Sequence, residues 1–150
     1  PAMIPDVDQS KVFRVYASAL TSLSIDENNN ISTADNRMLR RMIRDNRTRG
    51  IVPEDTILRW QSVRRGENHN ILRFQENADV IFNTSTLYEL AVLKKYIYPL
   101  LVAIEPEEPC YEQVRSIVKI LNYVCQADVD DEIPPTSLVR EFIGGNSFYR

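Results

Sequence analysis

The stretch STADNRMLRRMIRDNRTRG, residues 32–50, predicts the first long helix of the chain and holds much of its positive charge. Six arginines lie from Arg37 to Arg49, against one acidic residue, Asp45, while the chain of 150 residues has only 18 lysines and arginines in all. The whole chain nevertheless carries a net charge of −3, so the residues outside this stretch are clearly acidic. A helix so rich in arginine therefore needs an explanation of its own.

Helical spacing divides residues 32–50 into two faces. Ser32 and Asp35 have the spacing of a helix-capping box, and Gly50 is a typical helix end. At 100° per residue, apolar side chains fall on one face and arginines on the opposite face. The apolar residues are Met38, Leu39, Met42 and Ile43, and the arginines are Arg37, Arg40, Arg41, Arg44 and Arg47. We therefore expect a helix over about 33–49 with an apolar side and an arginine side.

The other apolar patterns predict two strands and further helices. Residues 11–18 (KVFRVYAS) and 78–83 (ADVIFN) are short apolar runs, so we expect two buried strands. The expected helices span 53–65, 86–104, 111–125 and 136–142, and the acidic segments 105–109 and 127–135 are expected to be loops. Strands separated by helices predict part of a parallel sheet, in an α/β chain that is mostly helical.

Composition and charge exclude several classes of protein. The chain is 43% hydrophobic and 26% charged, which is typical of a soluble globular domain. No apolar run reaches the ~20 residues that a membrane span needs, and no secretory signal pattern is present. Mild acidity argues against nucleic acid as a partner of the whole surface. Because Cys110 and Cys125 are too few for a disulfide framework, we expect a cytoplasmic protein. Both cysteines are expected to pack between helices.

Three other candidate sites have simpler interpretations. Residues 26–37 resemble a calcium loop, but Ile31 replaces its glycine and Arg37 its final glutamate, so we predict no metal site. His69, the only histidine, lies in the polar segment GENHN, which predicts an exposed loop residue rather than a catalyst. The acidic residues Asp128, Asp130, Asp131 and Glu132 are expected to form a solvated loop.

The arginine face favours phosphate as its ligand. Solvated helix faces usually mix charges of both signs, whereas a face of arginines alone repels itself unless it binds an anion. The guanidinium group is suited to bidentate contact with phosphate. An ordinary solvated face remains the simplest alternative. A nucleic-acid helix would be expected to carry aromatic residues, and a membrane-surface helix would need Trp or Phe anchors, which this face lacks.

Several segments of the chain resemble a known family. DNRMLRRMIRDNRTRG, residues 35–50, is similar to the lid segment of the uridine kinase and phosphoribulokinase family of P-loop kinases. The resemblance runs from about residue 11 to residue 148, and is also carried by VYASALTSLSIDENN (15–29), TILRWQSVRRGENHNI (56–71), ADVIFNTSTLYELAVLKK (78–95) and SLVREFIGG (137–145). It implies an ATP-dependent, Mg²⁺-requiring kinase that phosphorylates the 5′-hydroxyl of a uridine-like nucleoside.

The resemblance also implies roles for individual residues. Arg41 matches the lid arginine that approaches the nucleoside, so it is a substrate-binding residue. Arg44 matches an arginine that holds the ATP phosphates and acts in catalysis, and Arg49 matches another on the phosphate side. Asn83, after the second predicted strand, would lie near the adenine. Ile51 stands where nucleoside-specific members carry arginine, so the resemblance leaves the identity of the nucleoside open.

Two parts of the family's catalytic machinery are missing from the sequence. No GxxxxGK[ST] phosphate loop occurs, and neither does the acidic base that precedes the first predicted strand in the family. We therefore expect the C-terminal part of a kinase, inactive alone, with core residues 1–104 and a helical extension, 105–150. The expected partners are ATP, Mg²⁺, a nucleoside and an upstream kinase half, with a homo-oligomer left open. The alternative is a non-catalytic regulatory or assembly module whose arginine helix binds a nucleotide or an acidic partner.

Overall fold

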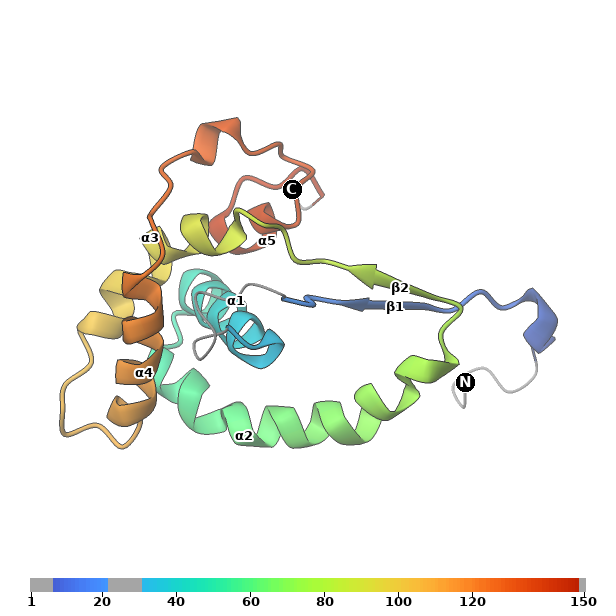
Figure 1. The fold of residues 1–150 in the computed structure, drawn as a ribbon, viewed down its shortest axis with the longest axis horizontal. Coiled ribbons are helices and arrows are strands. Elements are labelled where there is room, and N and C mark those ends of the chain that lie inside the picture. The colour runs from blue at the N-terminus through green and yellow to red at the C-terminus, as the bar shows by residue number, and fades with distance from the viewer. Residues whose placement is uncertain (1–6, 22–30, 149–150) are drawn as a thin grey trace.

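A computed structural model describes residues 7–21 and 31–148, which form a helical assembly beside one pair of strands (Figure 1). The elements follow the order β1 (Val15–Ser18), α1 (Thr33–Arg49), α2 (Pro53–Asn70), β2 (Val80–Asn83), α3 (Glu89–Val102), α4 (Tyr111–Asn122) and α5 (Val139–Ile143). Short 3-10 helices occupy Gln9–Lys11, Leu72–Asn77 and Asp130–Glu132. The mostly helical chain with parallel strands agrees with the expected α/β class.

Helix α1 forms where its sequence predicts it. The Ser32 hydroxyl accepts a hydrogen bond from the Asp35 backbone N–H at 3.1 Å and donates one to the Asp35 carboxylate at 2.6 Å. Gly50 ends the helix with φ of 64°, a left-handed conformation that glycine adopts without steric cost. The predicted apolar side is confirmed, because Met38, Leu39, Met42 and Ile43 are all buried.

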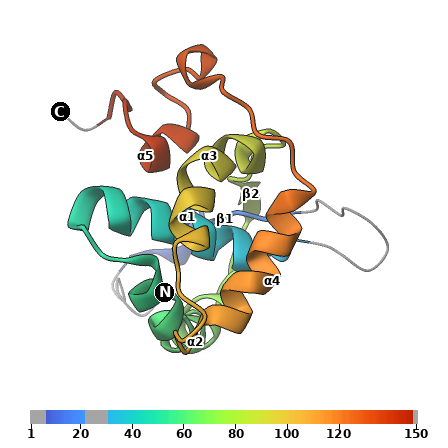
Figure 2. The same ribbon diagram turned by 90° about the vertical axis from the view of Figure 1, so that its left-hand side faces the viewer.

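The main hydrophobic core forms around α1, which packs against α2, α3 and α5 (Figure 2). Besides the apolar residues of α1, the core includes Ile57 and Trp60 of α2, Leu93, Ile97 and Leu101 of α3, Val114, Ile117 and Leu121 of α4, and Phe142 of α5. Residues from both sides of position 104 thus share one core. The predicted division into a kinase core, 1–104, and a helical extension, 105–150, therefore does not coincide with a break in packing and stays a prediction about function.

Helix α2 is longer than its sequence predicts. It begins at Pro53 as expected but continues to Asn70, so the prediction that His69 lies in a loop is wrong. His69 is exposed in the last helical turn. A glycine inside a helix costs only ~1 kcal/mol relative to alanine, so Gly66 does not end a helix that is already formed. The polar residues 66–70 reflect exposure of the helix, because its buried residues all lie between Pro53 and Trp60.

The remaining helices are present but differ from the predictions at their ends. α3 and α4 stop before the predicted residues 104 and 125, and α5 begins at Val139 instead of residue 136. Cys110 is buried as expected, whereas Cys125 lies beyond the end of α4 and is exposed, so its predicted packing is wrong. Among the described residues, no helix is long and apolar enough to cross a membrane.

The two strands pair in parallel, as predicted, but are not buried. Val15 lies opposite Val80 and Ser18 opposite Asn83 in the register of the sheet. Val15, Ile81 and Phe82 are each more than half exposed, so the prediction of two buried strands is wrong. Within the described part of the chain, no residue of β1 or β2 belongs to a hydrophobic core cluster. Apolar composition predicted both strands, but β1 begins at Val15 rather than at residue 11 and β2 at Val80 rather than at residue 78. Among the described residues, neither core cluster covers them.

An ion-pair network attaches the acidic segment after α4 to α3. Lys95 lies 2.7 Å from the Asp130 carboxylate and 3.4 Å from the Asp128 carboxylate, and the Tyr96 hydroxyl donates to Asp130 at 2.7 Å. Arg140 donates to the backbone carbonyl of Asp130 at 2.6 Å. The expected solvated loop is therefore wrong for Asp130, which is partly buried at the start of the Asp130–Glu132 3-10 helix, because the cation that binds it comes from a distant helix. Asp128 is exposed outside any helix or strand, as predicted.

Low pH should weaken this ion-pair network, because it protonates the Asp130 carboxylate. The neighbouring Lys95 ammonium holds the pKa of the Asp130 carboxyl below its ordinary value of 3.8. A lowered folded-state pKa gives stability that is present above about pH 4 and is lost as the pH falls through the folded-state pKa. We expect Asp130→Asn to lower the free energy of unfolding by about 0.5–1 kcal/mol at pH 7, since the pair is partly screened by solvent.

Urea unfolding of both proteins between pH 7 and pH 3 measures this effect. The difference between wild type and Asp130→Asn should shrink as the pH falls from about 4 through the lowered folded-state pKa of Asp130. Asp131→Asn removes the same charge from an exposed neighbour and should change stability less. A difference that stays constant down to pH 3 would contradict a contribution from the ionised Asp130.

Candidate anion-binding site

Each arginine of α1 already has an acceptor within the protein. The ion pairs join Arg37 to Glu67, Arg40 to Glu89, Arg41 and Arg49 to Asp45, and Arg44 to Glu141, and Arg47 donates to the backbone carbonyl of Glu141. The expectation that this face repels itself unless an external anion binds is therefore wrong. Acidic residues of α2, α3 and α5 balance much of its charge.

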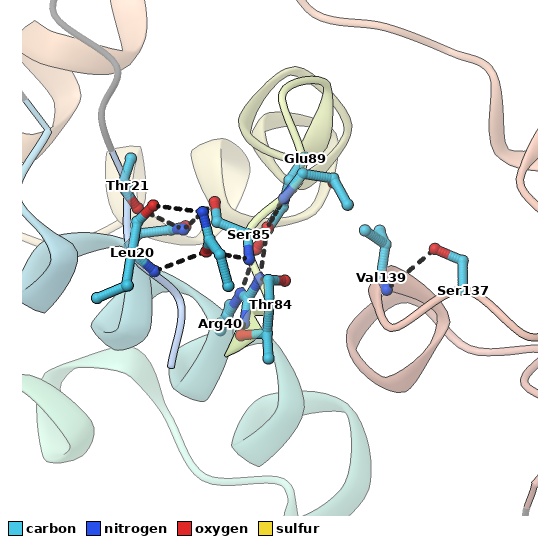
Figure 3. Close-up of polar contacts among 11 residues, drawn as sticks. Leu20, Thr21, Arg40, Thr84, Ser85, Glu89, Ser137 and Val139 are labelled. Carbon is cyan, nitrogen blue, oxygen red and sulfur yellow. Dashed lines mark hydrogen bonds and ion pairs between the residues drawn. The ribbon is translucent and has the colours of Figure 1, made fainter. Parts of the chain in front are cut away.

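Arg40 is buried rather than part of an open arginine face. Figure 3 shows its side chain directed at Thr84 and Glu89, which follow β2. Its guanidinium group donates to the Thr84 carbonyl at 2.7 Å and to Glu89 at 2.5 Å, with a second ion-pair contact to the same carboxylate. The Arg40 guanidinium also lies 5.1 Å from the centre of the Phe142 ring. Arg40 thus joins α1 to α3 and α5, a structural role that its sequence position did not predict.

A cavity of about 230 Å³ lies beside α1 at the carboxyl ends of both strands. Its position is set by Ser18, the last residue of β1, and by Thr84, which directly follows β2. The lining comprises Ala17, Ser18, Ala19, Arg37, Arg40, Arg41, Arg44, Trp60, Glu67, Thr84 and Phe142. Open α/β sheets bind their ligands in the crevice outside the carboxyl ends of the parallel strands. The topology and the arginines therefore point to the same place.

Two buried polar atoms in the lining lack a hydrogen-bond partner among the described residues. These are the hydroxyl oxygen of Ser18, a residue only 7% exposed, and Nε of Arg44. A buried donor without a partner costs ~1–3 kcal/mol, so such atoms usually contact water or a ligand. A hydroxyl and a guanidinium N–H are both donors to an anion. The cavity is thus suited to a ligand that carries several acceptor oxygens.

The structure separates the site residues that the sequence predicts. Arg41 and Arg44 both line the cavity, whereas Arg49 and Asn83 do not. Arg49 lies in the last turn of α1, exposed and 2.6 Å from Asp45. The side-chain oxygen of Asn83 accepts from the Leu20 backbone N–H at 2.9 Å, and its amide donates to the Leu20 carbonyl at 3.0 Å. Asn83 therefore fixes the chain after β1 to the end of β2.

Sequence reasoning missed Ser18, Arg37 and Trp60 as lining residues. Ser18 had a usable signal, because it ends a predicted parallel strand and strand ends are where such sheets bind ligands. No sequence signal marked Trp60 as a lining residue, since its position is typical of the core side of an amphipathic helix. Arg37 was predicted on the arginine side but without a function.

The described residues contain no group of three or more histidine, cysteine, aspartate or glutamate side chains placed to hold a metal ion. The calcium-like segment 26–37 falls partly outside the described residues, since the description resumes at Ile31. Comparison of the chain with protein-family models, curated proteins and solved structures gives no match in any of the three. The resemblance to the uridine kinase family stays a prediction.

Proposed function

We propose that the cavity binds nucleotide phosphates and that the chain is part of an ATP-dependent phosphotransferase acting on a nucleoside hydroxyl. The observation that carries the proposal is the lining of the cavity at the carboxyl ends of the two parallel strands. Arg41 and Arg44 lie there together with two buried donors that have no partner among the described residues, the Ser18 hydroxyl and Nε of Arg44. Phosphate oxygens accept hydrogen bonds from arginine in a bidentate geometry, and charge-assisted bonds are the stronger ones. The resemblance of residues 35–50 to a kinase lid adds the nucleoside and the reaction.

The proposed roles follow from the chemistry of phosphoryl transfer. The γ-phosphoryl group leaves the bridging oxygen of ATP and bonds to the nucleoside 5′-oxygen, whose proton passes to the base proposed in the upstream half, while charge spreads over the three other oxygens of the phosphoryl group. Arg44 stabilises this charge, and Arg41 is directed toward the acceptor. The roles proposed for this chain are those of its arginines, with the Ser18 hydroxyl as a further donor to the phosphates.

The uncovered sheet supports a further part of the proposal, an upstream kinase half of the same protein that contributes the P-loop, the base and additional strands. Parallel sheets are almost always covered on both faces, yet Phe13, Val15, Ile81 and Phe82 are exposed apolar residues in or beside these strands. Hydrogen exchange at residues 15–18 and 80–83 should slow in a longer protein that includes that half. Equally fast exchange in both proteins would contradict the addition of strands.

Trp60 offers a direct test of anion binding. It is the only tryptophan in the chain, and it lines the cavity, so its fluorescence reports on what enters. We expect inorganic tripolyphosphate to change Trp60 emission in a saturable way. Arg44→Gln should weaken the binding about tenfold or more, because a hydrogen bond to a charged group contributes ~1.5–3 kcal/mol.

Arg59→Gln is the matched control, since Arg59 is exposed on α2 and its loss changes the net charge by the same amount. Equal weakening by both variants would mean that only overall charge matters, and the absence of any saturable response would overturn the phosphate site. ATP itself should bind weakly to this chain. Tight, Mg²⁺-dependent binding of ATP would contradict the proposal that half of the site lies upstream.

A further inference from the structure

The segment SLVREFIGG, residues 137–145, places a carboxylate next to the proposed phosphate site. Oε1 of Glu141 in α5 lies 2.8 Å from Nη1 of Arg44. The backbone carbonyl of the same residue accepts a hydrogen bond from Arg47 at 2.8 Å. Phe142, the next residue, lines the cavity and stacks on Arg40. Phe142 of this segment therefore lines the site, and Glu141 supplies an anion to one of its arginines.

The carboxylates that pair with α1 differ in how easily they can leave. The exposed fractions of the side chains are 1% for Glu89, 3% for Asp45, 15% for Glu67 and 40% for Glu141. Moving a buried charge away from its partner is costly, whereas an exposed ion pair contributes little and can be replaced by water. The Glu141 carboxylate is therefore the exchangeable member of the set.

The backbone around Glu141 is fixed by packing, whereas its carboxylate is partly exposed to solvent. Phe142 and Val139 are buried on either side of it. Gly144 approaches Arg47 so closely that a Cβ atom there would lie 3.0 Å from the guanidinium, and its φ of 98° also favours glycine. Side-chain rotation of Glu141 can thus release Arg44 without moving α5.

We infer that Glu141 is an internal competitor for anions at Arg44. Its carboxylate occupies Nη1 of Arg44, a donor that a ligand phosphate would use, and it swings into solvent when a polyphosphate binds. This inference rests on the proposed phosphate site and adds a preference for highly charged anions to it. A terminal phosphate with close to two negative charges can displace the single charge of Glu141, whereas a weakly charged anion gains less from the exchange.

The test compares Glu141→Gln with wild type as the full chain, using tripolyphosphate and Trp60 fluorescence. Glutamine keeps the shape of the side chain but removes the competing charge. Because an exposed ion pair has a modest strength, we expect binding to become about two- to fivefold tighter. Glu112→Gln removes the same charge from an exposed position on α4 and should leave the affinity unchanged.

The possible outcomes separate this inference from the proposal beneath it. If wild type binds tripolyphosphate and Glu141→Gln binds it equally or more weakly, Glu141 only positions Arg44. That result would overturn the role of Glu141 as a competitor while leaving the phosphate site intact. An equal gain in Glu112→Gln would also overturn it, as an effect of net charge. Failure of both wild type and Glu141→Gln to bind would remove the phosphate site and the inference together.

Discussion

Arg40→Leu is expected to lower the free energy of unfolding by about 3–5 kcal/mol, because it leaves a buried carboxylate without its positively charged partner. Glu89 is only 1% exposed and accepts two contacts from the Arg40 guanidinium. The same substitution removes the bond to the Thr84 carbonyl and the stacking on Phe142. Urea unfolding at pH 7, followed by circular dichroism, measures the change.

Two variants make the cause of that change specific. Arg40→Leu combined with Glu89→Leu removes both charges and should recover much of the lost stability, since apolar replacement of a whole buried pair is often neutral. Arg59→Leu changes an exposed arginine and should cost less than about 0.5 kcal/mol. A loss below 1 kcal/mol in Arg40→Leu would show that the pair contributes little to folding.

The second large effect is expected in catalysis. In a longer protein that includes the proposed upstream half, Arg44→Ala should reduce kcat by about 10³ with folding intact, because an arginine that stabilises the transferring phosphoryl group can contribute this much. Steady-state turnover with ATP and a nucleoside, together with thermal melting, measures both properties. Unchanged turnover in Arg44→Ala would overturn the assignment of Arg44 to a lid over the phosphates.

Arg49→Ala distinguishes the family resemblance from the geometry. The resemblance gives Arg49 a place beside the phosphates, whereas the structure puts it outside the cavity, exposed and paired with Asp45. If the geometry governs function, Arg49→Ala should change kcat by less than about tenfold while Arg44→Ala changes it by about 10³. Equal losses in both variants would mean that α1 moves substantially when ligands bind.

Local features of the sequence were reliable predictors of secondary structure. The bounds of α1 followed from a serine cap, a glycine stop and a helical period, all of which act within a few residues. The two strands and their parallel pairing followed from apolar runs separated by helices. Burial of those strands could not be predicted in the same way, because it depends on which other element covers them. His69 was misplaced because a polar composition is shared by loops and exposed helices.

The candidate site was predictable only in part. Arg41 and Arg44 were identified from the charge pattern of α1 and the resemblance, and both line the cavity. Ser18 and Trp60 came from other elements, and no motif marked them. Asn83 was assigned to nucleotide binding, yet its amide joins the ends of the two strands.

The sequence by itself determined that residues 33–49 form a helix with one apolar side and an excess of arginine, because capping and helical period are local. Only the tertiary structure decided what each arginine does. The carboxylates that pair with Arg37, Arg40 and Arg44 lie 30, 49 and 97 residues further along the chain. Their burial ranges from almost complete at Glu89 to partial at Glu141. Folding therefore fixes Arg40 as a structural residue and leaves Arg44 beside the cavity with an exchangeable partner.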